Sequence, residues 1–164
     1  ASGGSVTLDA GQLVTILSSG DDSAISFTVV GTDIASAAQT ESITGATAAA
    51  TATGSKFFKT VSSITAVGDP AANVTAGVSA SSADVIFAGR ARLKGSYVVN
   101  SATAGTIKFR NSSASGDTLM EFGTVASATV TRDITIPSDG VLFTSGIYIT
   151  YTGATFASIT AFHA

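Results

Sequence analysis

The amino-acid sequence predicts an all-β protein with antiparallel strands, and two observations predict it. Valine and isoleucine together number 26 against 6 leucines, and β-branched side chains favour strands over helices. Apolar and polar residues also alternate with a period of two, in runs that Gly, Asn, Asp and Ser clusters separate. Such runs at a spacing of about 8–12 residues are typical of a sandwich or barrel. We therefore expect an antiparallel β-sandwich of Ig-like or jelly-roll-like kind.

Each expected strand follows one alternating run. Ile25, Phe27 and Val29 point to one side of a strand, and the residues between them point to the other. The Ala-rich stretch 46–53 lacks a large apolar stripe at helical spacing, so we expect strand edge or loop there. The expected strands lie at about residues 5–9, 12–18, 24–32, 38–45, 55–67, 72–79, 85–88, 91–101, 104–111, 118–124, 130–137, 141–152 (with room for an interruption) and 156–163.

Composition and charge divide the chain into two halves. The stretch 79–84 is small and polar, which favours a boundary. Residues 1–83 carry two basic and six acidic side chains, a net charge of −4, whereas residues 84–164 carry six basic and five acidic ones, a net charge of +1. We expect an acidic N-terminal and a slightly basic C-terminal sandwich domain of viable size. A single larger sandwich is the alternative.

The composition excludes several classes of protein. There is no cysteine, which excludes a disulfide scaffold and a cysteine zinc site. A net charge of −3 and a sequence pI of about 4.8 argue against nucleic-acid binding through overall charge. No run approaches the ~20 apolar residues of a membrane-spanning helix, and residues 1–4 show no signal-peptide pattern. We expect neither nucleic acid nor membrane as a partner.

Residues suited to catalysis are scarce. The single histidine, His163, is the penultimate residue, a poor place for a precisely held general base. Nucleophile-elbow, phosphate-loop and zinc-protease motifs do not occur. Asp21 and Asp22 stand between two expected strands, where a tight turn is a plainer explanation than the six to eight oxygen ligands of Ca²⁺. We expect no enzyme, no cofactor and no metal.

The clearest functional signal is a cluster of basic side chains in two consecutive expected strands. If these strands form a hairpin around residues 102–105, the burial of Leu93 together with Ile107 fixes its register. In that register five of the eight basic side chains fall on one outer face. They are Arg90, Arg92, Lys94, Lys108 and Arg110.

Two explanations of this basic face stay open. It could contact an anionic partner, such as an acidic protein surface that includes the N-terminal half of a second subunit. It could also be a solvated face on which Lys and Arg discourage further strand pairing. Nucleic acid is a weaker candidate partner, because Phe and Tyr do not interleave with the basic residues as stacking platforms.

A carbohydrate platform is not expected from the aromatic residues. Tryptophan is absent and tyrosine occurs three times. Parity places Tyr97 inside with Val99, and it places Tyr148 and Tyr151 on opposite sides of their strand. Recognition of a glycan through loops remains an alternative.

Two segments carry a family resemblance. The runs VTILSSGDDS and ISFTVVGTD within residues 14–33, then QTESITGA at 39–46 and KFFKTVSSI at 56–64, resemble virion proteins of tailed bacteriophages. The resemblance covers much of residues 13–67 and, less closely, residues 88–110. The resemblance lies in the residue patterns of strands and turns, and it implies no catalytic residue.

The resemblance implies a structural protein of the virion, assembled in the host cytoplasm. The implied role is a capsid decoration (cement) protein that docks on the major capsid protein, as a homo-oligomer and most simply a trimer. The alternatives are a tail, neck or fibre component, with other virion proteins as partners, and a module that binds a host glycan.

Overall fold

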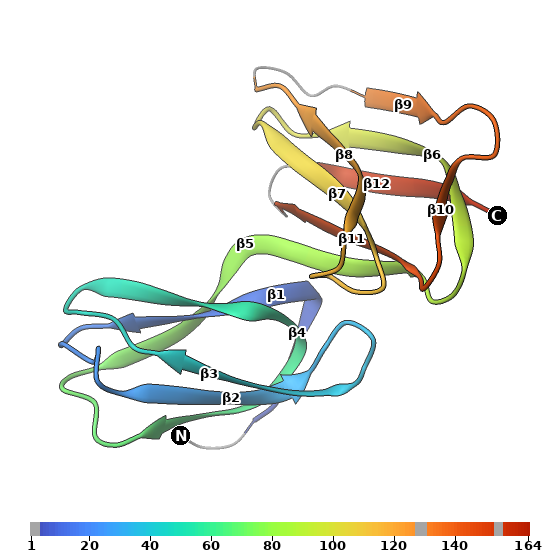
Figure 1. Cartoon of the computed structure of the whole chain (residues 1–164). Helices are drawn as coiled ribbons and strands as arrows, with labels where there is room; N and C mark the ends of the chain where they lie inside the picture. The colour runs from blue at the N-terminus through green and yellow to red at the C-terminus, as the bar shows by residue number, and fades with distance from the viewer. Residues whose placement is uncertain (1–3, 127–130, 153–155) are drawn as a thin grey trace. The chain divides into compact units, whose positions relative to one another are not determined.

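A computed structural model describes residues 4–126, 131–152 and 156–164 of the chain. All regular structure in these ranges is β, and every strand pairing whose register is known is antiparallel (Figure 1). The predicted all-β, antiparallel class is therefore confirmed. The described ranges contain no helix that could span a membrane. The chain divides into two compact units, Ala1–Ser79 (unit 1) and Ala80–Ala164 (unit 2).

Unit 1 is one strongly curved sheet around its own core. Its strands are β1 (Val6–Ser18), β2 (Ser26–Thr32), β3 (Ala38–Thr44), β4 (Ala50–Val67) and the first part of β5 (Val74–Phe87), in the order β3-β2-β4-β1-β5. The long strand β4 pairs with β1 along its first two thirds and with β2 along its last third. The buried core residues are Val14, Ile16, Phe27, Val29, Ile43, Phe58 and Val61.

A buried carboxylate fixes the outer edge of β3 to β4. Glu41 is only 8% exposed. Its Oε1 atom accepts hydrogen bonds from the backbone N–H of Ser55 at 2.6 Å and from the Ser55 hydroxyl at 2.8 Å. Gly54 leaves room for this carboxylate, because a Cβ there would lie 2.5 Å from Glu41 Oε2. Side-chain hydrogen bonds thus take the place of a backbone ladder between β3 and the start of β4.

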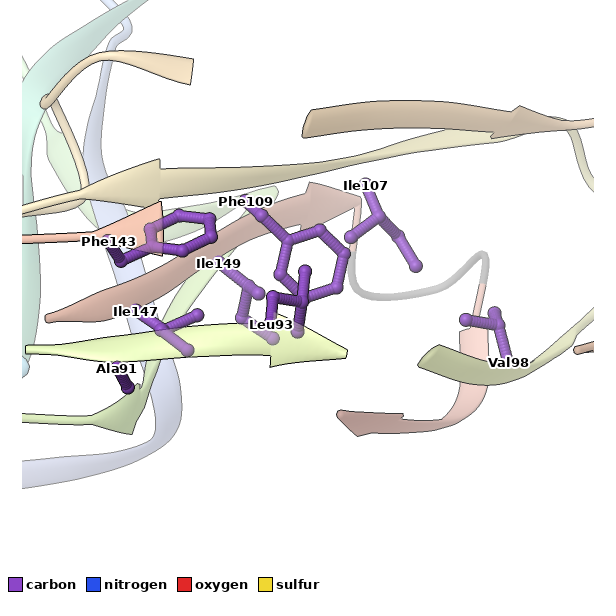
Figure 2. Packing of buried hydrophobic residues seen from close by; sticks show 8 residues of the cluster. All are labelled: Ala91, Leu93, Val98, Ile107, Phe109, Phe143, Ile147 and Ile149. Atoms are coloured by element: carbon purple, nitrogen blue, oxygen red, sulfur yellow. The ribbon is translucent and has the colours of Figure 1, made fainter. Parts of the chain in front are cut away.

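Unit 2 is a sandwich of two sheets. Its strands after β5 are β6 (Ala91–Asn100), β7 (Gly105–Asn111), β8 (Thr118–Thr124), β9 (Thr131–Thr135), β10 (Val141–Phe143), β11 (Ile147–Thr152) and β12 (Phe156–His163). One sheet has the order β5-β11-β7-β8; the other has the order β10-β6-β12, with β9 also paired to β6. Figure 2 shows the core: Ala91, Leu93, Val98, Ile107, Phe109, Phe143, Ile147 and Ile149.

The expected strand ends at 118–124 and 156–163 coincide with β8 and β12, and the expected interruption of 141–152 separates β10 from β11. Two expected breaks are absent. Residues 5–9 and 12–18 join in β1, and residues 72–79 and 85–88 join in β5. Small polar residues do not end a strand when a neighbour continues the pairing, as Ser81 does with Thr152. The boundary between units therefore falls inside β5, four residues before the expected position.

A β-bulge in β6 reverses the predicted orientation of its second half. In the pairing with β12, Leu93 lies opposite His163 but Gly95 lies opposite Phe162, so Lys94 is an extra residue. After the bulge Val98 is fully buried, and Tyr97 is 37% exposed. The prediction that Tyr97 packs inside was therefore wrong, because it assumed unbroken alternation.

Asp22 joins three loops at one end of unit 1. It is completely buried, and its Oδ1 atom accepts the backbone N–H of Ala71 at 2.7 Å. Its own N–H donates to the carbonyl of Ala46 at 2.9 Å, and its carbonyl accepts the N–H of Ile25 at 2.8 Å. The loops between β1 and β2, β3 and β4, and β4 and β5 therefore meet at one residue.

We predict that D22A lowers the free energy of unfolding by about 2 kcal/mol, because it removes the buried side chain that accepts the N–H of Ala71. D22N keeps an oxygen at this position and should lose less. D21A is the matched control: it removes an exposed carboxylate and should have a much smaller effect. Urea unfolding followed by far-UV circular dichroism measures all three. Equal losses for D21A and D22A would contradict the role of Asp22.

Candidate interaction surface

The five basic residues do not form one face. Strand β6 pairs with β9, β10 and β12, whereas β7 pairs with β11 and β8. The predicted hairpin of β6 with β7 is therefore wrong, because the connection between them crosses from one sheet of the sandwich to the other. Leu93 and Phe109 both point into the shared core (Figure 2). Outward side chains of β6 and β7 consequently face opposite sides of unit 2.

The two basic residues of β7 bind partners within unit 2. Lys108 Nζ lies 3.6 Å from Glu121 Oε2 on β8. Arg110 Nε donates to Thr150 Oγ1 at 3.0 Å, and its Nη1 donates to the carbonyl of Gly116 at 2.9 Å. Both side chains are thus held on the outer side of the β5-β11-β7-β8 sheet by neighbouring strands and by the turn before β8.

The other three basic residues, Arg90, Arg92 and Lys94, form what we call the basic corner, at the start of β6. Arg90 is exposed in the turn before the strand. Arg92 Nη1 donates to the carbonyl of Asp139 at 3.4 Å, and the Lys94 side chain lies beside Gly140 in the same turn. Within the described ranges none of the three forms an ion pair. No carboxylate in the described part of the chain therefore lies within ion-pair distance of these three side chains.

Two aromatic rings lie on the outer side of the β10-β6-β12 sheet. Tyr97 is 37% exposed and Phe162 is 51% exposed. Tyr97 pairs with Thr160 and Phe162 pairs with Gly95, so the two rings are diagonal neighbours on adjacent strands. Asp133 of β9 lies opposite Tyr97 on its other flank. We call these residues the aromatic face. Phe162 covers Gly95, which directly follows Lys94, so the aromatic face adjoins the basic corner.

Sequence reasoning missed the aromatic face for one identifiable reason. Sequence alternation points away from the bulge at Lys94, because unbroken alternation gives an apolar inner side with Tyr97 and Val99, whereas the bulged strand buries the polar Ser96 and Asn100. Gly95 was the available signal, since a glycine inside a strand often marks a bulge or a close approach of backbone. A Cβ on Gly95 would lie 2.6 Å from the carbonyl oxygen of Ile134.

Unit 1 carries an apolar groove of about 240 Å³ between β1, β4 and β5. Its walls include Val6, Leu8 and Val78, of which Val6 is 49% exposed and Val78 is 43% exposed. Strand assignments do not predict such a groove, since it depends on how far the curved sheet leaves its apolar side uncovered.

The loop with Asp21 and Asp22 forms a turn. Asp21 Oδ1 accepts the N–H and the hydroxyl of Ser23 at 3.1 Å and 2.7 Å, and these bonds lower the pKa of the Asp21 carboxyl. In the part of the chain that the structure describes, no group of three or more His, Cys, Asp or Glu side chains could hold a metal ion. His163 packs its ring against Phe87, with centroids 4.9 Å apart.

Comparison of the chain with protein-family models, with curated proteins and with solved structures gave no match. The function proposed below is therefore argued from the residues of this chain and from the resemblance of its segments.

We predict that R110A lowers the free energy of unfolding by about 1–2 kcal/mol, because the variant loses two hydrogen bonds made by a charged donor. R90A should change it little, since Arg90 is exposed in a turn. Tyrosine fluorescence during urea unfolding is suitable, because all three tyrosines lie in unit 2. Equal stability of R110A and R90A would show that the Arg110 contacts do not stabilise the unit.

Proposed function

We propose that the protein is a non-enzymatic structural protein of a tailed-bacteriophage virion, and specifically a capsid decoration protein that docks on the assembled coat shell. The segments within residues 13–67 support the virion assignment through their resemblance to phage proteins. The observation that carries the docking role is the basic corner. Three cations that form no ion pair among the described residues lie beside exposed aromatic rings in unit 2.

This combination suits a protein interface. Arginine and aromatic side chains are enriched where protein surfaces meet, and a few such residues supply most of the binding energy. Tyr97 and Phe162 would supply apolar area at the contact. Arg90, Arg92 and Lys94 would supply attraction to an acidic coat surface, which raises the association rate and selects the partner. Lys108 and Arg110 lie on the opposite side of the sandwich and are excluded from this contact.

Symmetry supports a further part of the proposal. A coat shell presents the same surface many times around its symmetry axes, and closed homo-oligomers match such repeats. We propose a homo-oligomer, with a trimer as the simplest form. Analytical ultracentrifugation of the purified protein tests this, and a monomer at all concentrations would contradict it.

A sedimentation assay tests docking directly. Purified protein is mixed with undecorated capsids, and bound protein is separated from free protein. We expect saturable binding at a fixed ratio to coat subunits that weakens as salt screens the charges. The triple variant R90E/R92E/K94E should bind at least about tenfold more weakly. Its matched control is K56E/K59E/K108E, which changes the net charge equally but leaves the basic corner intact.

The outcomes separate the parts of the proposal. Equal weakening by both triple variants would show that net charge, and not the basic corner, governs binding. Absence of binding by the native protein would overturn the decoration role. The same assay with purified tails then tests the alternative of a tail, neck or fibre component.

A second candidate function, binding of a host glycan, is favoured by the aromatic face. Sugar rings pack their C–H faces on aromatic side chains, and carboxylates accept hydrogen bonds from hydroxyl groups. Tyr97 and Phe162 provide the rings, and Asp133 lies beside Tyr97. Inward packing of Tyr97 would have argued against an aromatic platform for sugars. Because Tyr97 is exposed, that argument no longer applies.

For this candidate we predict that labelled protein is retained on host cells and that Y97A reduces the retention at least about tenfold, as expected for loss of a binding anchor. L119A is the control, because Leu119 is also exposed but lies on β8 of the other sheet. Soluble host polysaccharide should compete with the cells. Retention that Y97A leaves unchanged would exclude this face as the glycan site.

A further inference from the structure

Unit 2 contains a cavity that the proposed function does not use. It has a volume of about 280 Å³ and lies between β5, β11 and β12. This is close to the lower end of the volumes of small-ligand sites, roughly 300–1,000 Å³. The residues that matter for its chemistry are Asp84, Ile149, Tyr151, Phe156, Ser158 and Ile159.

The cavity combines an apolar wall with two aromatic rings. Ile149 of β11 and Ile159 of β12 line it from the two sheets. The rings of Tyr151 and Phe156 stand edge to face, with centroids 6.2 Å apart and an interplanar angle of 80°. An alkyl chain can pack on such walls, and a cation can lie over the face of an aromatic ring.

Asp84 is the only charged residue among the described residues that line this cavity. It lies opposite Ile149 in the pairing of β5 with β11, so Asp84 and Tyr151 are diagonal neighbours on the same side of the sheet. In agreement with this placement, the pKa of Tyr151 is raised, first by burial and second by the negative charge of Asp84. The Tyr151 phenol therefore stays protonated at neutral pH.

The Asp84 carboxylate has no cationic partner within the ranges that the structure describes. Its Oδ1 atom accepts the backbone N–H of Val85 at 2.9 Å. Among the described residues no lysine or arginine pairs with it, although it is only partly exposed. Partial burial of a carboxylate is unfavourable unless a counter-charge or hydrogen-bond donors compensate it. Asp22 and Glu41 of unit 1 accept backbone N–H groups from other loops and strands, whereas Asp84 faces a cavity.

We propose that this cavity binds an organic ammonium ion, with the ammonium group at Asp84 and its alkyl chain along the isoleucines and the two rings. The charge of the carboxylate selects a cation over a neutral ligand of the same shape. Two sources carry this chemistry: a free alkylamine, and the lysine side chain of a partner protein. The proposal does not depend on the role in the virion.

A titration followed by ¹H–¹⁵N NMR tests the proposal on the full chain. The probes are n-butylammonium chloride and n-butanol, which have similar shape but differ in charge. We expect saturable shifts of the amide signals of Val85, Tyr151 and Ser158 with butylammonium, and at least about tenfold weaker binding of butanol. Equal binding of both probes, or no shift with either, would overturn the proposal.

Two variants and a third probe sharpen the result. D84N keeps the shape of the side chain and should bind butylammonium at least about tenfold more weakly, while D133N removes an exposed carboxylate on β9 and should bind it as the native protein does. Unchanged binding by D84N overturns the proposal. N-acetyl-lysine methylamide distinguishes the sources: tighter binding than butylammonium indicates a partner's lysine, and weaker binding indicates a free amine.

Discussion

The thin core between the two sheets of unit 2 is the constraint on which the other features of that unit depend. Nearly half of the chain is alanine, serine and threonine, so few large side chains are available to fill this space. Leu93, Phe109 and Phe143 are completely buried and come from three different strands. Each of these strands must therefore turn its apolar side inward. That requirement decides which side chains face outward, and so it separates the basic residues of β6 from those of β7.

Carboxylates contribute to this protein in two different ways. In unit 1, Asp22 and Glu41 are buried and accept backbone N–H groups, so they act as substitutes for the strand pairing that loops and sheet edges lack. Asp22 Oδ1 and both oxygens of Glu41 accept such bonds inside the fold, whereas Asp22 Oδ2 is buried without a partner among the described residues. Asp84 of unit 2 uses one oxygen in a local bond to the next residue and presents its charge to a cavity. Carboxylates thus hold loops and strands together in unit 1, whereas in unit 2 we propose that one of them binds a ligand.

The period-two alternation predicted the strands well, because burial on one side of a sheet leaves a direct trace in the order of residues; β8 and β12 have the expected bounds. Alternation does not say which strand is the neighbour. The partner of β6 depends on how the connection 101–104 crosses the sandwich. The prediction of a single basic face was wrong for that reason. The cavity at Asp84 also escaped prediction, since it requires β5 to meet β11 and β12, which follow it only after five intervening strands.

Strand β6 can be read in two registers. Unbroken alternation from Leu93 would place Tyr97 and Val99 inside, and the bulged strand instead places Val98 inside. The bulged strand also buries the polar Ser96 and Asn100, so hydrophobicity alone favours the unbroken register. The discrimination comes from the missing Cβ of Gly95 and from the hydrogen bond of the Ser96 hydroxyl to the carbonyl of Thr160 at 3.0 Å. The position of the bulge at Lys94 therefore determines which side chains of β6 are exposed on this sheet. A bulge placed after Tyr97 instead would turn Gly95 and Tyr97 inward and Ser96 outward without changing the composition of the strand.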